Sequence, residues 1–242
     1  MIKEVFTKRA HVMHYSSEIV PTKKEIEEIL TESIPLATSK QKAFAYKAYI
    51  VDAKGNSNNK IYNWCEGYKI EQDVIMEENL PEEKEKPWHI PNKGLMHLAS
   101  APWTLIWTPM DRKPNPYYEK AFKDTKSWWQ MDEKKLIEEQ CREQCLVEGS
   151  MMAQMIMGIT VEKGWDSSFN ICFPSDGNKG ILPENNKNYN KYSWSSMWSD
   201  IEYKPFLIQT IGKAKRYLYE GRTDKQRLLN TNPTIEDLFK FV

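Results

Sequence analysis

The chain is 242 residues long and 40% of these residues are hydrophobic, which is enough for a substantial core and excludes disorder as the dominant state. Lys and Arg total 34, as do Asp and Glu, so the formal net charge is zero and no overall field favours nucleic acid or an anionic membrane. The N-terminus lacks the apolar core of a secretory leader, and no later segment approaches the roughly 20 apolar residues of a membrane helix. We therefore expect a cytoplasmic protein with no nucleic-acid or membrane partner.

The first predicted element is a capped helix over residues 23–30. Thr22 can accept a hydrogen bond from an amide of the first turn, and Glu25, three residues later, completes a capping box. Ile26 and Ile29 then lie on one apolar stripe, which indicates that this helix packs against a core.

Segments dominated by aromatic and β-branched residues predict strands between and after the helices. The predicted strands cover residues 46–51, 104–108, 169–173 and 205–211. Two segments are predicted to be irregular, a charged loop at about 76–87 and an excursion rich in Asn and aromatic residues at about 178–203. A short helix is expected at 233–239, and we treat 1–242 as a single domain.

A long helix is predicted over 132–163, because this segment contains no proline and Gly164 follows it. Its second half, Met151 to Ile159, is apolar over most of the helix surface. Such a surface must be covered on several sides, so this helix is either the centre of the domain core or the core of a dimer.

Motifs for other chemistries are missing from the sequence. No Gly-rich phosphate loop and no serine nucleophile elbow is present, so neither a dinucleotide motif nor hydrolase chemistry is indicated. The cysteines are interpreted as structural thiols, because their spacing with one another and with the histidines fits no metal site. These cysteines are Cys65, Cys141, Cys145 and Cys172. No metal is predicted.

Four short segments carry the main indication of function. They are Lys8-Arg9-Ala10-His11, Ala37-Thr38-Ser39, Phe173-Pro174-Ser175-Asp176-Gly177 and Lys225-Gln226-Arg227. Their order and spacing resemble the FMN-dependent nitroreductase family, over most of the chain from about Lys8 to Leu238. The resemblance implies an α+β fold in which a mostly antiparallel central sheet is flanked by helices, one of them long and central. It also implies a homodimer with two FMN sites, each built from both chains.

The resemblance assigns the two terminal segments to the flavin phosphate. The family's opening strand carries two cations around a hydroxyl, and here Arg9 matches the first cation while His11 occupies the hydroxyl position. Met13 replaces the second cation. Near the other end of the chain, Lys225 and Arg227 match the family's Lys-x-Arg, so with Arg9 they are expected to bind the phosphate.

The two internal segments are assigned to the flavin ring. Ser39 is retained from the family's second segment, Lys42 replaces an Asn, and a positive charge near N1 or O2 would stabilise anionic reduced flavin. Phe44 replaces a Gln. In the third segment Asp176 replaces Glu, and Gly177 lets the backbone approach flavin N5 closely.

The resemblance implies an FMN-dependent oxidoreductase in which NAD(P)H gives hydride to flavin N5. The flavin would then reduce a small acceptor such as a nitroaromatic, a quinone or an enone, and no side chain is assigned as catalytic. One alternative is a flavin-fold protein with weak or no FMN binding that acts as a non-catalytic or interaction protein. The other is an FMN enzyme of different chemistry, such as oxidative cleavage or dehalogenation.

Overall fold

The computed structural model describes residues 11–37, 39, 46–52, 98, 100–109, 133–171, 201 and 204–217. Its helices are α2 (Lys23–Ser33), the short 3-10 helix η1 (Ile34–Leu36) and α6 (Glu133–Glu162). Its strands are β1 (Val12–Tyr15), β2 (Tyr46–Asp52), β3 (Trp103–Pro109), β4 (Asp166–Asn170), β5 (Leu207–Gly212) and β6 (Ala214–Tyr217). The predicted loop at 76–87 and helix at 233–239 lie outside the described residues, as does the excursion at 178–203 apart from Ile201.

Four strands form an antiparallel sheet in the order β2-β3-β5-β4. The two central strands are buried along their whole length, apart from the last residue of β3. Buried residues stand at successive positions instead of alternate ones because both faces of the sheet are covered. This arrangement confirms the predicted fold class, a mostly antiparallel sheet flanked by helices.

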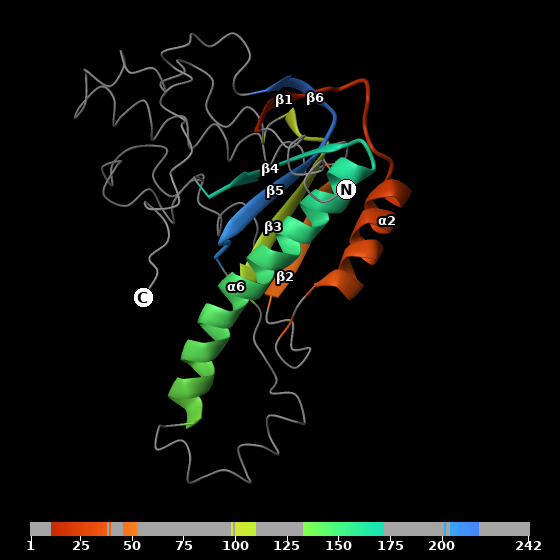
Figure 1. Ribbon diagram of the computed structural model, residues 1–242. Coiled ribbons are helices and arrows are strands. Elements are labelled where there is room, and N and C mark those ends of the chain that lie inside the picture. Colours follow the sequence, from red (N-terminus) through yellow and green to blue (C-terminus); the bar gives the residue numbers. More distant parts are fainter. Residues whose placement is uncertain are drawn as a thin grey trace, which may run out of the picture.

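Helix α6 covers one face of this sheet, and its N-terminal half extends beyond the strands (Figure 1). Met152, Ile156 and Ile159 are buried in one cluster with Leu105 of β3 and Ile211 of β5. The apolar half of the helix therefore belongs to the core of the chain itself, the first of the two predicted alternatives. Glycine at position 164, with φ of 84°, follows the helix end as predicted.

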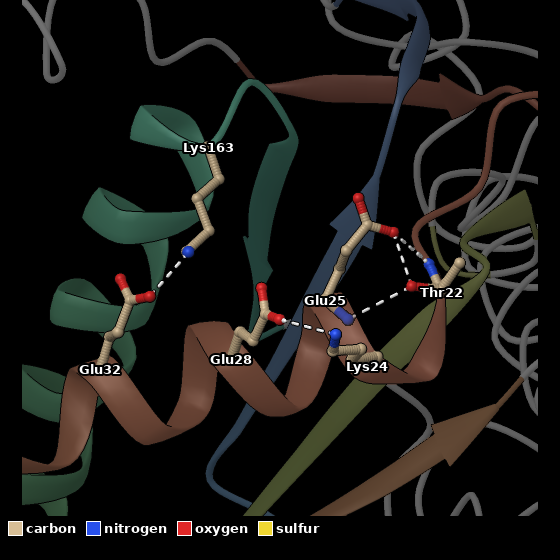
Figure 2. Close-up of polar contacts among 6 residues, drawn as sticks. All are labelled: Thr22, Lys24, Glu25, Glu28, Glu32 and Lys163. Carbon is tan, nitrogen blue, oxygen red and sulfur yellow. Dashed lines mark hydrogen bonds and ion pairs between the residues drawn. The ribbon is translucent and has the colours of Figure 1, made fainter.

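The predicted capping box begins α2. Thr22 Oγ1 accepts from the Glu25 amide at 3.3 Å, and Glu25 Oε2 accepts from the Thr22 amide at 2.7 Å (Figure 2). These hydrogen bonds, led by the one from the Thr22 backbone, lower the pKa of Glu25. At the other end of the helix, Lys163 of the α6 terminus donates to Glu32 at 2.7 Å, which joins the two helices.

A two-stranded antiparallel ribbon of β1 and β6 lies on the opposite face of the sheet from α6. The two faces are distinguished by β5, in which Gln209 donates to the Ala153 carbonyl of α6 while Thr210 bonds the hydroxyl of Tyr15 in β1. The Val12 amide donates to Ser168 Oγ of β4 at 2.8 Å. The sheet is therefore covered by helices on one face and by the ribbon on the other.

One strand prediction was wrong in its position, since β4 covers Asp166–Asn170 and not 169–173. The prediction relied on apolar residues, whereas the first half of β4 pairs with β5 through polar ones. Ser167 Oγ accepts from Gln209 at 3.2 Å, and the Ser168 carbonyl accepts from Thr210 at 3.3 Å. Strand β6 was not predicted.

Candidate functional site

Two of the eight residues predicted to bind the cofactor, His11 and Ser39, lie in the described part of the chain. The other six lie outside it: Arg9, Lys42, Asp176, Gly177, Lys225 and Arg227. For these six, the structure describes only the elements that precede or follow them.

The β1–β6 ribbon joins the two ends of the described chain. Val12 pairs with Tyr217, more than two hundred residues later in the sequence. Arg9 comes three residues before Val12, and Lys225 comes eight residues after Tyr217. The pairing therefore limits how far apart these two predicted phosphate ligands can be.

Asp166 of β4 anchors this ribbon to the sheet. Its carboxylate accepts from the Tyr217 hydroxyl at 2.8 Å and from the Ala214 amide at 2.9 Å. Lys213 Nζ lies 4.0 Å from the same carboxylate. These contacts all involve β6 or the residue before it, so they fix the strand that leads to the C-terminal segment.

His11 lies directly before β1, on the ribbon side of the sheet. Its Nδ1 is 3.5 Å from Ser168 Oγ, the hydroxyl that also accepts from the Val12 amide. The side chain is partly buried. An imidazole at this position can donate a hydrogen bond to an anion, as the resemblance implies.

Ser39 lies on the other side of the sheet, beside α6. Its Oγ donates to Oε2 of Glu148 at 2.8 Å, and the Glu148 side chain is 5% exposed. Because α6 and β1 cover opposite faces, the structure does not bring His11 and Ser39 into one cluster within the chain. Each belongs to its own group of contacts.

The surroundings of Glu148 are aromatic and closely packed. The Tyr46 ring centroid lies 5.6 Å from that of Trp107, and a Cβ on Gly149 would lie 2.6 Å from Cζ of Phe206. Glycine at this position lets the helix approach the start of β5. Burial, and then the negative charge of Glu148, raises the pKa of Tyr46 to about 12.

Glu148 was not singled out from the sequence. A signal for it exists: it shares one helix face with Cys145, Gly149 and Met152, all buried. A carboxyl group inside an apolar stripe departs from the amphipathic pattern of the helix, and such departures often mark functional or strained sites.

Two further findings concern partners. The part of the chain that the structure describes has no helix with the length and apolar character needed to cross a membrane. Among the same residues, no group of three or more His, Cys, Asp and Glu side chains is arranged to hold a metal ion.

No protein-family model and no curated protein matches this sequence. Solved structures match along nearly all of it. A proposed nitroreductase from Bacillus subtilis superposes with a TM-score of 0.60 at 14% identity, covering 99% of this chain and 98% of that one. A proposed nitroreductase from Exiguobacterium sibiricum, whose structure contains FMN, gives 0.59 at 11% identity, covering 100% and 97%.

A third structure is the NADPH:FMN oxidoreductase from Vibrio harveyi in complex with NAD+. It superposes with a TM-score of 0.52 at 10% identity, covering 89% of this chain and 70% of that one. At these identities the likeness is one of fold. The chain therefore has the fold of the nitroreductase proteins, as the four sequence segments predicted.

Proposed function

We propose that this chain is a divergent member of the FMN-dependent nitroreductase family, a cytoplasmic flavin oxidoreductase that uses NAD(P)H. The fold supports the class of protein. The observation that carries the proposal is the pairing of Val12 with Tyr217 within that fold. It joins the two chain ends whose cations match the family's phosphate segments.

The proposed phosphate ligands can be tested against the reach of the chain. An extended chain spans at most about 3.6 Å per residue, so Arg9 lies within about 11 Å of Val12, and Lys225 within about 29 Å of Tyr217. Arg227, ten residues after Tyr217, lies within about 36 Å of it. These limits allow Arg9, Lys225 and Arg227 to bind one dianion, which needs several charged donors. His11, beside Val12, adds a further donor on the same side of the sheet.

When bound, FMN would supply the chemistry, taking hydride at N5 and passing it to a small acceptor such as a nitroaromatic, a quinone or an enone. The chain's own residues would bind and orient the ring. We assign Ser39, Lys42, Asp176 and Gly177 to this role. No described side chain is assigned as an acid or a base.

A homodimer is part of the proposal. His11 contacts Ser168 of the sheet on the ribbon face, whereas Ser39 contacts α6, which covers the other face, so a single chain would have difficulty placing both on one flavin. A site shared by two chains removes this difficulty, because one subunit can supply His11 and the other Ser39. Light scattering at micromolar concentration should then give twice the chain mass.

The main test is the flavin content of the purified protein. Wild-type protein should be yellow and should oxidise NAD(P)H when a quinone or nitroaromatic is added. Arg227→Ala should lose most of its flavin during gel filtration while its circular dichroism stays unchanged, because one of the phosphate's charged donors is removed. Lys204→Ala, which removes an exposed cation outside the proposed site, is the matched control.

Two outcomes would contradict the proposal in different ways. Full retention of flavin by Arg227→Ala would show that Arg227 does not bind the phosphate. Wild-type protein that neither contains nor binds FMN would overturn the enzyme assignment and favour the non-catalytic alternative.

A further inference from the structure

A buried carboxyl group on α6 accepts a hydrogen bond from a hydroxyl in one of the segments proposed to bind FMN. Glu148 lies in a stripe with Cys145, Gly149 and Met152, and the Glu148 side chain is 5% exposed. Burying a carboxyl group among apolar neighbours is unfavourable unless it is hydrogen-bonded. An apolar residue would fill this position without that cost, so the carboxyl group calls for a specific role.

Ser39 is a hydrogen-bond donor to this group. Its Oγ lies 2.8 Å from Glu148 Oε2 and donates to it, across 109 residues of sequence. The same carboxylate acts on Tyr46, because the negative charge of Glu148, after burial, helps to raise the pKa of the Tyr46 hydroxyl. A charged acceptor makes the hydrogen bond stronger than one between neutral groups.

This hydrogen bond determines what else Ser39 can bind. A serine hydroxyl has one hydrogen and two acceptor lone pairs. Because the carboxylate takes the hydrogen, any further partner of Ser39 Oγ must itself be a donor. The Ser39 side chain is only partly buried, so a ligand can approach it.

FMN carries few groups that can donate to such an oxygen. The phosphate oxygens and the two ring carbonyls only accept, whereas N3–H of the ring and the ribityl hydroxyls can donate. We propose that Glu148 makes Ser39 a hydrogen-bond acceptor for the flavin, receiving N3–H or a ribityl hydroxyl and excluding contact with phosphate. The inference rests on the proposed function, and Glu148 is a positioning residue that acts through Ser39.

Flavin analogues that lack one donor each can test this. Binding of FMN, of 3-deaza-FMN, in which C–H replaces N3–H, and of the monodeoxyribityl analogues is measured by flavin fluorescence. Wild-type protein should bind one of these analogues about tenfold more weakly than FMN, the loss expected for one hydrogen bond. The analogue that loses affinity identifies the donor.

The variants separate the hydrogen bond from general structural effects. Ser39→Ala should bind FMN and that analogue equally, whereas Ser39→Thr should restore the preference because it keeps the hydroxyl. Glu148→Gln keeps the shape of the side chain but removes its charge, so the preference for FMN should shrink. Glu162→Gln, an exposed residue of the same helix, is the matched control and should behave as wild type.

A second readout uses the flavin-free protein. In a double-mutant cycle of Ser39→Ala and Glu148→Gln, the unfolding equilibrium constants should show a coupling of about tenfold, as for a hydrogen bond to a charged group. No coupling would mean that the carboxyl group does not hold the hydroxyl, and the inference would be wrong.

The binding data distinguish this inference from the proposed function. If wild-type protein binds FMN but Ser39→Ala leaves every analogue ratio unchanged, Ser39 does not accept from the flavin, while the proposed function stands. If wild-type protein binds no FMN, the proposed function fails, and this inference fails with it.

Discussion

The two faces of the four-stranded sheet differ in the side chains that they bury. On the α6 face, Trp103, Leu105 and Trp107 of β3 pack against the apolar stripe of the helix. On the ribbon face, Thr210 and Ser168 are equally buried but carry hydroxyl groups. Apolar packing is non-directional and tolerates small shifts, whereas hydrogen bonds fix both distance and orientation.

On the ribbon face, hydrogen bonds hold strands β1 and β6 in a fixed orientation on the sheet. Tyr15 is 1% exposed, and its hydroxyl lies 2.7 Å from Thr210 Oγ1, while burial raises its pKa above the ordinary value. Together with the Val12–Ser168 hydrogen bond, this contact sets the position of β1 on the sheet. The comparison indicates that apolar packing holds α6 on one face, whereas directional hydrogen bonds orient β1 and β6 on the other.

The largest expected effect comes from breaking the apolar face. Ile156→Ala should lower the free energy of unfolding by about 2–5 kcal/mol, because it removes buried methyl groups and leaves a cavity. Ile156 is 1% exposed in the core cluster. Urea unfolding followed by tryptophan fluorescence measures the change.

Met151→Ala is the matched control on the same helix. Met151 is 39% exposed, so its truncation should change the free energy of unfolding by about 0.5 kcal/mol or less. Equal losses for the two substitutions would show that the stripe through Ile156 is not the core.

A smaller effect is expected from crowding the ribbon face. A Cβ on Gly212 would lie 2.6 Å from Cδ of Pro102 and 2.7 Å from Cδ1 of Tyr15. Both are parts of rigid rings, so Gly212→Ala should lower the free energy of unfolding by about 1–3 kcal/mol. The melting temperature should fall accordingly.

The control for this change is another glycine, in α6. A Cβ on Gly158 would meet nothing within 4 Å, so Gly158→Ala should raise the free energy of unfolding by about 0.5–1 kcal/mol through helix propensity. Opposite signs for the two glycines are expected. A stabilising Gly212→Ala would mean that the ribbon does not approach the sheet this closely.

The smallest effect concerns Tyr46, whose pKa is affected by Glu148 of α6. Tyr46 has its pKa raised from 10.0 to about 12, first by burial and then by Glu148. The folded state therefore holds this proton more tightly than the unfolded state, so stability is lost as the pH rises from about 10 to about 12. Ultraviolet absorbance of tyrosinate measures the titration.

Variants assign that titration to its causes. Tyr46→Phe should remove the high-pH component, and Glu148→Gln should lower its pKa only in part, because burial is the larger cause. If Glu148→Gln leaves the titration unchanged, the carboxylate does not act on this ring.

Local features of the fold were predictable because neighbouring residues encode them. The capping box of Thr22 and Glu25 depends on residues three apart, and the apolar run of α6 and the helix end at Gly164 are equally local. Strands β2 and β3 were predicted within one residue at each end for the same reason. The four short segments led further, to the fold that the solved structures share.

Other features depended on residues far away in the sequence. They are the bounds of β4, the formation of β6 and the contacts of Glu148. Ser167 and Ser168 lie in a strand because Gln209 and Thr210 offer them partners, which no local pattern reveals. The Ser39–Glu148 hydrogen bond spans 109 residues.

The sequence by itself determined where α2, α6, β2 and β3 form and which family the chain resembles. Only the tertiary structure decided that Val12 pairs with Tyr217, that His11 contacts β4 on the ribbon face, and that Ser39 contacts α6 on the other side of the sheet. The physical reason is that periodicity and capping are short-range properties of the chain. Strand pairing and buried polar contacts form only when distant segments have been brought together by burial of the apolar core.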